Sequence, residues 1–551
     1  MSDSYTVPLG ALTLGSLSYW TYFQRGEHFL YAVQYIQGFA ITVLAGAIFF
    51  SQQADISFLA SLSHSIRLSA IFLAGLYANC AFYRLFLNPL NKFPGPYFAR
   101  LTKFNHCFRN AGLDAYKQFL NDHQKYNTKF LRIGPNDLSV VDVRAVQIVS
   151  AADSKCVKSP WYQNDYPLIS LHTTRDRAMH DRRRRVWAPA FSDKALRGYE
   201  QRVQRLNDLL ITKLDESKGS PLDATNLLNL YSFDTMGDLA FGNDFGMLES
   251  GKPHWAIKLL NEGMDPLGLQ LPVWFFRTLA AIPGLAAGYW KFIAFCTQQL
   301  ENRIAVHGKT DPNKPDITQS LIDHYLKSSP ENKKELWPML CGDSRLIIVA
   351  GSDTTAATLS YLFYHIASKK DWQEKLRKEI QDIKASTKST ERTIADQSLK
   401  DAPVLNGMIN ETLRLNPPVP SGVFRQTPPE GVTIGETFIP GNSVIQIPTY
   451  VMSRSEDNYV EPAQFMPERW SSRPELIKEK DAFIPFSTGP FGCIGKNLAY
   501  MEIRTITSQI IDQFDVSLAP GEDGRKLVEE AVDHFTLGLK PLMLEFRRRN
   551  W

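Results

Sequence analysis

Uncharged apolar runs near the start of the chain set the first limit on how it can fold. Phe29 to Phe50 contains no charged residue, and neither does Leu68 to Tyr83. A helix needs about 20 mainly apolar residues to cross the hydrocarbon core of a bilayer. Val7 to Phe23 is a weaker candidate, because serine, threonine and glycine dilute it. The sequence predicts a membrane anchor of two or three helices, and helices buried in a soluble core are the alternative.

Basic residues and prolines indicate where the anchor ends. Lys92, Arg100 and Lys103 follow the last apolar run, whereas Arg25 is the only basic residue before Arg67. Cytoplasmic flanks of membrane spans carry more lysine and arginine, so the remainder of the chain is expected in the cytosol.

Proline and glycine then divide the chain into parts. Phe93-Pro94-Gly95-Pro96 is a stiff stretch that stops a helix. We therefore expect an anchor over residues 1–90, a hinge over 91–96 and one large domain, rich in helices, over 97–551. Within that domain Leu271 to Cys296 is apolar but interrupted by Arg277, Pro283 and Lys291. It fits a surface segment dipping into the membrane, and core packing is the alternative.

Composition narrows the function classes. The net charge is only +4 over 551 residues, which does not suggest nucleic-acid binding. The six cysteines are far apart and form no CxxC pair, so neither a zinc site nor a disulfide framework is indicated.

One cysteine stands in an unusual setting. Cys493 lies in the glycine-rich stretch 486–495, just before a predicted helix over Lys496 to Arg504. Gly492 and Gly495 let the backbone approach a flat cofactor and free amide groups to point at sulfur. A thiolate bound to haem iron would push electron density onto the metal and favour O–O cleavage. The alternative is a buried cysteine that only fills space.

A second motif lies inside the apolar run Leu346 to Ile366. Residues 350–355 read Ala-Gly-Ser-Asp-Thr-Thr, which places Asp353 beside Thr354 in the middle of a predicted helix. Small and hydroxyl residues weaken the helical hydrogen-bond ladder, and an acid beside an alcohol can relay protons. The alternative is an acid that only pairs within the helix.

Two charged motifs complete the set. Glu411 and Arg414 are three residues apart on a predicted helix and can pair. His180 and Arg184 share a helix face within the basic run 180–185. The other arginines of that run, Arg182, Arg183 and Arg185, are expected to point outward, either as a docking face for an acidic electron donor or as a solvated turn.

Together these motifs, in this order, resemble the cytochrome P-450 superfamily of haem-thiolate monooxygenases, from about Pro94 to the C-terminus. The pattern Phe-x-x-Gly-x-x-x-Cys-x-Gly is matched by Phe486, Gly489, Cys493 and Gly495. The resemblance implies a mainly α fold with small β-sheets (α+β). It also implies haem b as cofactor, with Cys493 as the axial iron ligand.

The resemblance also assigns the surroundings of the haem. An aromatic residue and an arginine four positions later usually face the propionates, and His180 and Arg184 occupy those positions. Arg425 is a third candidate, eleven residues after Arg414. At Phe491 the sequence departs from the family, which usually has a basic residue there, so the other three should carry more of the propionate charge.

Two further roles come from the family. Asp353 and Thr354 correspond to the pair that delivers protons during oxygen activation. Glu411, Arg414 and Arg469 correspond to a scaffold triad that holds the haem-side core without taking part in the chemistry.

The resemblance implies partners and a location as well. Electrons are expected from NADPH through a separate cytochrome P-450 reductase, since no glycine-rich dinucleotide fingerprint is present; cytochrome b5 is a further expected donor. The stretches that would contact the substrate by analogy with the family are mostly apolar, which indicates a hydrophobic small-molecule substrate. The chain looks most like filamentous fungal members, which points to specialised metabolism of terpenoids, alkaloids or polyketides at the endoplasmic reticulum membrane.

Two other functions are open at this stage. A haem-thiolate isomerase or dehydratase would use neither O2 nor reductase, but such enzymes tend to lose the acid–alcohol pair that Asp353 and Thr354 form here. A non-enzymatic membrane haem protein, such as a sensor or carrier, is the third class, and the same retained pair argues against it.

Overall fold

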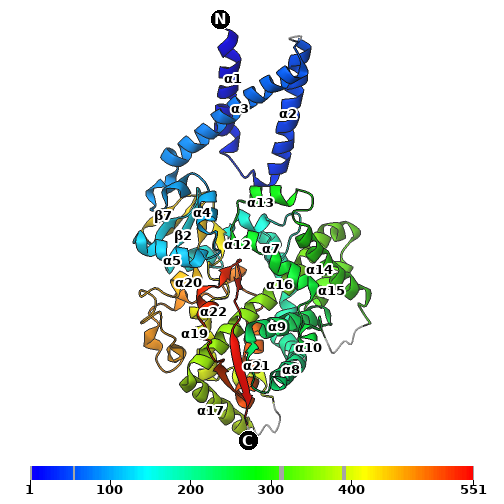
Figure 1. Ribbon diagram of the computed structural model, residues 1–551, viewed down its shortest axis with the longest axis vertical. Helices are drawn as coiled ribbons and strands as arrows, with labels where there is room; N and C mark the ends of the chain where they lie inside the picture. Colours follow the sequence, from blue (N-terminus) through cyan, green and yellow to red (C-terminus); the bar gives the residue numbers. More distant parts are fainter. Residues whose placement is uncertain (1–2, 54–55, 310–314, 388–392, 550–551) are drawn as a thin grey trace. The chain divides into compact units, whose positions relative to one another are not determined.

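The fold is given by a computed structural model that describes residues 3–53, 56–309, 315–387 and 393–549 (Figure 1). Helices dominate and the sheets are small, which confirms the predicted mainly helical α+β class. Two compact units can be separated. Unit 1 comprises residues 1–109, 131–138 and 270–287, and unit 2 comprises 110–130, 139–269 and 288–551.

Unit 1 contains the apolar helices near the start of the chain. Its helices are α1 (Asp3–Ser18), α2 (Ala32–Gln53), α3 (Phe58–Phe82), α4 (Phe104–Arg109) and α13 (Val273–Ala280). Two helical stretches, Phe29–Gln53 and Phe58–Leu87, are long and apolar enough to cross a membrane, and only 6% of the apolar window of each is buried. Apolar helices that expose most of their surface fit membrane anchoring.

Helices α1 and α3 approach each other closely (Figure 1). A Cβ atom on Gly15 would lie 2.0 Å from the carbonyl oxygen of Phe72, and one on Gly75 would lie 2.3 Å from that of Leu12. Small residues at such crossings let helix backbones come together in lipid. Asn79 adds a polar link, because its side-chain amide donates to the Ser16 hydroxyl at 2.9 Å.

The proline-rich hinge is held by backbone contacts within unit 1. The amide of Arg132, in β1 (Phe130–Arg132), donates to the carbonyl of Pro94 at 2.7 Å. A Cβ atom on Gly95 would lie 2.2 Å from the carbonyl oxygen of Arg132. Glycine is therefore required at 95 by close backbone approach.

The apolar segment from Leu271 to Cys296 divides into two different environments. Its first part forms α13, which packs against α2 and places the rings of Trp274 and Phe275 6.0 and 5.1 Å from the ring of Phe104. Its second part begins α14, where Phe292 is fully buried. The first part thus accompanies the anchor helices, whereas the second is core.

Unit 2 is built around many helices. They are α5 (Ala115–Lys125), α6 (Arg144–Ser150), α7 (Arg177–Trp187), α8 (Asp193–Glu216), α9 (Ala224–Phe241), α10 (Met247–Ser250), α11 (Trp255–Glu262), α12 (Asp265–Gly268), α14 (Ala287–Ala305), α15 (Gln319–Lys327), α16 (Pro330–Ser368), α17 (Lys370–Thr387), α18 (Asp396–Leu399), α19 (Pro403–Leu415), α20 (Thr449–Met452), α21 (Lys496–Gln513) and α22 (Arg525–Glu529).

The longest helix, α16, runs through the core of unit 2 beside α9 (Figure 1). It too is long and apolar enough to span a membrane, but 67% of its apolar window is buried, which makes it a core helix. A Cβ atom on Gly351 would lie 2.5 Å from the sulfur of Met236 in α9. This close approach fixes α9 against the part of α16 that carries Asp353.

The sheets of unit 2 are short and antiparallel. In one, β3 (Val157–Lys158) and β8 (Val444–Gln446) pair with opposite edges of β5 (Phe424–Gln426). In another, β12 (Met543–Arg548) pairs with β4 (Leu222–Asp223) and β9 (Phe514–Leu518). Two hairpins, β6–β7 (Val432–Ile434, Thr437–Ile439) and β10–β11 (Val532–Asp533, Leu537–Gly538), complete them. The register places Lys158 opposite Arg425.

Candidate active site

The loop around Cys493 folds back on itself. The Cys493 amide donates to the carbonyl of Phe486 at 2.9 Å, and that of Gly492 donates to the carbonyl of Gly489 at 2.9 Å. Gly489 has φ +65°, and a Cβ atom there would lie 1.7 Å from the carbonyl oxygen of Ser150. Only glycine fits this position, because both the left-handed backbone and the contact with α6 exclude a side chain.

The sulfur of Cys493 has the surroundings of a metal ligand. Its side chain is exposed, whereas four of the other five cysteines are buried. Although the residue is solvent-accessible, the protein packed around it desolvates the thiol and raises its pKa, whereas the backbone N–H groups of Gly495 and Lys496, together with the Arg184 charge, act in the opposite direction. A bound metal supplies the missing positive charge and deprotonates such a thiol.

The rest of the described chain offers no alternative metal site. In residues 3–53, 56–309, 315–387 and 393–549, no three His, Cys, Asp or Glu side chains gather to hold an ion. A cysteine with no second metal ligand beside it fits a metal that is already bound within a macrocycle, as haem iron is.

The other motif residues of the loop have packing roles. The ring of Phe486 lies 5.4 Å from that of Tyr500, and the Tyr500 hydroxyl donates to the side-chain oxygen of Asn410 at 2.6 Å. This contact joins the loop to α21 and α19. A Cβ atom on Gly495 would lie 3.9 Å from the Cys493 sulfur, an ordinary contact distance.

Helix α7 brings His180 and Arg184 to this loop. A guanidinium N–H of Arg184 donates to the carbonyl of Gly492 at 2.8 Å. The ring of His180 lies 4.6 Å from that of Phe491, and its Nδ1 is 2.9 Å from Asp181. Burial is the main cause that lowers the pKa of His180 to about 4. His180 is therefore neutral at physiological pH and contributes a hydrogen-bonding group rather than a charge.

The expected outward direction of Arg183 is wrong. Arg183 is buried, and its Nε lies 2.5 Å from Asp343 of α16. The same carboxylate accepts hydrogen bonds from the Trp187 indole and the Leu171 amide. A buried carboxylate with three donors holds α7 against the central helix, whereas Arg182 and Arg185 are exposed as predicted.

Arg425 reaches the same loop from β5. It is buried, its guanidinium carbon lies 5.0 Å from the centre of the Phe491 ring, and it donates to the carbonyl of Phe424 at 3.1 Å. Its Nε has no hydrogen-bond partner. The structure thus brings His180, Arg184 and Arg425 together around Phe491.

Sequence reasoning missed one cation in this cluster. Lys158 of β3 is buried, and its ammonium lies 5.0 Å from the centre of the Phe491 ring. A lysine in a two-residue strand gives little signal by itself. The location of Lys158 in this cluster follows only from its strand pairing with Arg425, which lies 267 positions later in the chain.

Asp353 and Thr354 lie next to each other on α16 but in different surroundings. The Thr354 hydroxyl donates to the Ala350 carbonyl at 2.8 Å. Asp353 lines a cavity, and burial raises its pKa to about 7, opposed by a hydrogen bond with the Thr536 hydroxyl. Within the described residues, no hydrogen bond joins either side chain to the Cys493 loop.

The cavity at Asp353 has a volume of about 360 Å³ and a wall that is about equally polar and apolar. Its charged and titratable lining groups besides Asp353 are Asp223, His534 and Lys540. Amide and hydroxyl side chains from α9, α11, α16 and β10–β11 complete the wall, among them those of Asn226, Asn229, Asn261, Ser360 and Thr536. No sequence pattern indicated that these segments form one cavity, because they lie far apart in the chain.

A second buried acid connects the helix that follows the cysteine loop to α16. Glu502 of α21 is hydrogen-bonded to Thr355, and burial raises its pKa to about 8. It is therefore mainly protonated at neutral pH and links the two helices without adding a charge. It was not predicted from the sequence.

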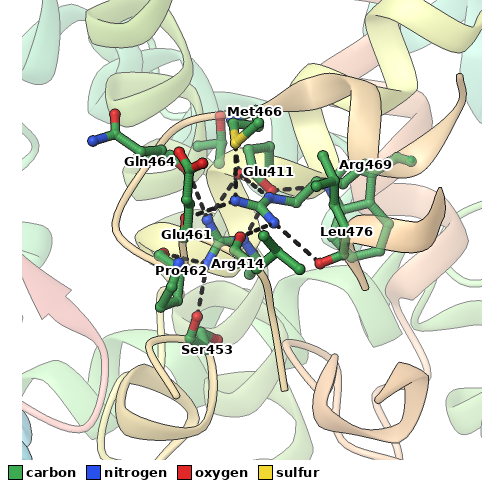
Figure 2. Close-up of polar contacts among 12 residues, drawn as sticks. Glu411, Arg414, Ser453, Glu461, Pro462, Gln464, Met466, Arg469 and Leu476 are labelled. Atoms are coloured by element: carbon green, nitrogen blue, oxygen red, sulfur yellow. Dashed lines mark hydrogen bonds and ion pairs between the residues drawn. The ribbon is translucent and has the colours of Figure 1, made fainter. Parts of the chain in front are cut away.

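The scaffold residues form one buried network (Figure 2). Glu411 is bound by Arg414 through two contacts of 2.9 and 2.8 Å and by Arg469 at 3.2 Å. All three side chains are fully buried. The remaining arginine N–H groups donate to backbone carbonyls of the segment that leads toward the cysteine loop, those of Ser453, Val460, Glu461, Pro462, Gln464 and Leu476.

Three features of this site are typical of a haem-thiolate oxygenase. Cys493 receives backbone hydrogen bonds, cationic side chains contact its loop, and a core helix carries an acid beside an alcohol. The family model described as cytochrome P-450 matches residues 94–546. The chain therefore belongs to the cytochrome P-450 family, as predicted, and the family implies a haem-thiolate cofactor and an electron-donating partner.

Curated relatives agree with this assignment over nearly the whole chain. A cytochrome P-450 monooxygenase of Purpureocillium lilacinum is 44% identical over 98% of this chain and 97% of that protein. Tryprostatin B 6-hydroxylase of Aspergillus fumigatus is 38% identical over 98% of this chain and 95% of that protein. A monooxygenase of Aspergillus versicolor is also 38% identical. The predicted enzyme class and likeness to filamentous fungal members are confirmed.

Proposed function

We propose that this protein is a membrane-anchored monooxygenase that binds haem b through Cys493. It oxidises a hydrophobic small molecule with O2 and electrons from NADPH. The observation that carries the proposal is the hydrogen-bonded sulfur of Cys493, in a solvent-accessible loop that His180 and Arg184 of α7 and Arg425 of β5 contact. Haem bound there would supply the oxygen-activating chemistry.

The residues around Phe491 suit the carboxylates of haem. Arg184 and Arg425 have no carboxylate partner among the described residues, and both retain N–H groups that can donate to a propionate. His180 adds a neutral imidazole. Charge-assisted hydrogen bonds of this kind are stronger than neutral ones and orient a planar ligand.

We assign proton delivery to Asp353 and Thr354. With a pKa of about 7, the Asp353 carboxyl can both hold and release a proton under physiological conditions. The cavity beside it, which has polar side chains in its wall, provides room for water that would return the proton. The Thr354 hydroxyl, on the next residue of α16, would orient the group that receives it.

Electron supply is assigned to a separate NADPH–cytochrome P-450 reductase, with cytochrome b5 as a second donor. Arg182 and Arg185 are exposed on α7, the helix that carries His180 and Arg184. Exposed cations on that helix suit docking of an acidic electron carrier.

Location and pathway follow from the anchor and the relatives. The apolar helices of unit 1 and the basic residues Lys92, Arg100 and Lys103 support an endoplasmic reticulum membrane protein whose catalytic part is cytosolic. A hydroxylase of a named metabolite among the relatives supports hydroxylation in specialised metabolism.

Replacement of Cys493 by serine tests the haem assignment. In membranes containing wild-type protein, the reduced carbon monoxide complex should show the thiolate-type absorption band, and the Cys493→Ser protein should lose it. Cys80→Ser, in anchor helix α3, is the matched control and should leave the band unchanged. A thiolate-type band in the Cys493→Ser protein would overturn the proposal.

Turnover tests the oxygenase assignment. The protein and a reductase are expressed together in a host that makes candidate terpenoid, alkaloid or polyketide precursors, and products are analysed by mass spectrometry. A product heavier by one oxygen, formed only with reductase and NADPH, is expected. Turnover without either would favour a haem-thiolate isomerase or dehydratase.

A further inference from the structure

The ammonium group of Lys158 is buried without an ion-pair partner among the described residues. The residue is 4% exposed, and its Nζ donates to the carbonyls of Leu171 and His172, each at 2.7 Å. An ammonium has three donors, so one is left without a partner among the described residues. No carboxylate lies within ion-pair distance of it there.

Two more cations share these surroundings. Arg425 and Lys158 are paired residues on neighbouring strands, so their side chains emerge on the same face of the sheet. Arg184 adds a third charge from α7 and contacts the cysteine loop at Gly492. We call Lys158, Arg184 and Arg425 the cation cluster. Within the described residues none of the three has an ion pair.

A cluster of this kind is costly unless an anion joins it. Taking one ion out of water costs several kcal/mol even after relaxation, and like charges add to that cost. Burial, with the charges of Arg425 and Arg184, lowers the pKa of Lys158 well below its usual range, while the Asp343 charge acts in the opposite direction. Negative charge that enters the cluster would favour the charged form of Lys158.

Phe491 contacts two of the three cations of the cluster. Its ring centre lies 5.0 Å from the Lys158 ammonium and 5.0 Å from the Arg425 guanidinium. Arg177 is also near the ring, at 5.4 Å, but Asp181 neutralises it at 2.8 Å. An aromatic face attracts cations without neutralising them, so Phe491 can position two cations while leaving their charge available to a ligand.

We propose that Lys158 binds a haem propionate in place of the side chain that Phe491 lacks, and that the ring of Phe491 positions Lys158 and Arg425 for this contact. The proposal rests on the haem site proposed above. It explains how a loop without a basic residue at 491 can still bind both haem carboxylates: the charge comes from β3 instead of from the loop.

A structural role for Lys158 is the competing explanation. Its two hydrogen bonds could simply fix the segment that contains Leu171 and His172. The two roles differ in one respect. A cation introduced at 491 could replace a lost propionate partner, but it has no reason to restore the carbonyl contacts of a purely structural lysine.

The test measures haem retention in four detergent-solubilised holoenzymes: wild type, Lys158→Met, Phe491→Arg and the double variant. Haem loss is followed as first-order transfer to excess apomyoglobin. Lys158→Met should lose haem about tenfold faster or more, since a charge-assisted hydrogen bond is lost. The double variant should return to within about threefold of wild type, because the introduced arginine regains the carboxylate.

The matched control is Lys155→Met. Lys155 lies three positions before Lys158, is exposed and forms an ion pair with Glu430. Its haem loss should equal that of wild type. Phe491→Arg alone places a fourth cation beside the cluster and should not slow haem loss. Equal haem loss from Lys158→Met and wild type would overturn the inference.

The remaining outcomes also decide between the explanations. Fast haem loss that the double variant does not correct, or failure of the double variant to accumulate as holoenzyme, assigns Lys158 a structural role and overturns the proposal. The reduced carbon monoxide spectrum separates the two levels. Absence of a thiolate-type band in wild type contradicts the proposed function, whereas a normal band with unchanged retention in Lys158→Met contradicts only the role of Lys158.

Discussion

At the scale of single residues, Asp353 has a carboxyl with a pKa of about 7 and lines a cavity with polar side chains in its wall. Replacing it by asparagine keeps the shape of the side chain but removes the proton. General acid catalysis typically contributes about 10²–10⁴-fold, so product formation should fall by roughly 10²-fold or more. The measurement is product per NADPH oxidised with the identified substrate, alongside the haem content, which should not change.

The pH dependence separates proton delivery from a structural effect. A donor carboxyl is protonated below its pKa, so wild-type turnover should decline as pH rises through about 7. The hydrogen bond from Thr536 stabilises the carboxylate, so Thr536→Val should raise the pKa of Asp353 and move this decline to higher pH. The same decline in Asp353→Asn would assign it to another group.

Residues with local signals were predictable, and residues whose role depends on a distant partner were not. Cys493 and Gly489 belong to one short loop, so their sequence spacing was sufficient to predict that they lie together. Arg183 was expected at the surface, because nothing near it in sequence indicates Asp343, its buried partner in α16. Lys158 was missed for the same reason, since its surroundings are created by Arg425 and Phe491.

At the scale of elements, Glu411 joins α19 to the segment between residues 453 and 476. Glu411→Gln would leave Arg414 and Arg469 buried without their anion. Removing one partner of a buried pair costs about 3–5 kcal/mol, a large part of the stability of a typical protein. We expect little or no folded holoenzyme, measured as haem-bound yield and by thermal unfolding.

The control for this prediction is an ion pair on the surface. Arg525 and Glu529 pair at 3.2 Å, with 72% and 62% of their side chains exposed. Exposed pairs contribute at most about 1 kcal/mol, so Glu529→Gln should leave yield and unfolding almost unchanged. Normal yield of Glu411→Gln would show that the network is not needed to hold this segment.

Helix α1 gives a prediction about the membrane anchor. Its contacts at Gly15 and Gly75 join it to α3, while Leu9, Leu14 and Leu17 remain exposed. Exposed leucines on a helix that pairs with a membrane span favour lipid around them. We predict three spans, which places the N-terminus on the opposite side of the membrane from the domain that we propose to be cytosolic. A glycosylation tag fused ahead of Met1 should therefore be glycosylated in microsomes.

The same tag fused after Trp551 serves as its control and should stay unmodified, because that end belongs to the part expected in the cytosol. An unmodified N-terminal tag with normal membrane insertion would reduce the anchor to two spans. The sequence left two and three spans open, since serine, threonine and glycine lower the hydropathy of Val7 to Phe23. The contact with α3 explains the small residues of α1, because they let the two helices pack closely.

At the scale of the whole molecule, fold class and family were predictable, whereas the shapes formed by several segments were not. The spacing of apolar residues, together with the prolines and glycines that end helices, indicated a helical domain after an anchor. The cavity at Asp353 forms where α9, α11, α16 and β10–β11 pack together, and no local sequence pattern predicts this packing. Likewise, the apolar segment after Leu271 divides between α13 and the core because only its first part packs against α2.

This division predicts how the protein behaves without its anchor. Removing residues 1–87 deletes α2 and uncovers the apolar side of α13. Trp274 of α13 is already 43% exposed, and Ile282 and Leu285, in the segment that follows this helix, are 48% and 60% exposed. Exposed apolar patches of this kind partition into lipid interfaces. The protein without residues 1–87 should therefore still sediment with phosphatidylcholine vesicles. In that shortened protein, Trp274→Glu with Leu285→Glu should weaken vesicle binding about tenfold or more, because burying one large apolar side chain contributes about 1.5–3 kcal/mol.

The control variant changes an exposed apolar residue elsewhere. Phe438 of β7 is 48% exposed and belongs to unit 2, so Phe438→Glu in the same shortened protein should leave vesicle binding unchanged. If Phe438→Glu releases the protein as strongly as the α13 variant, binding depends on general surface hydrophobicity. If the shortened protein stays in solution, the deleted helices hold all the membrane affinity and α13 only packs against them. Retained binding in the α13 variant would assign the lipid contact to another surface.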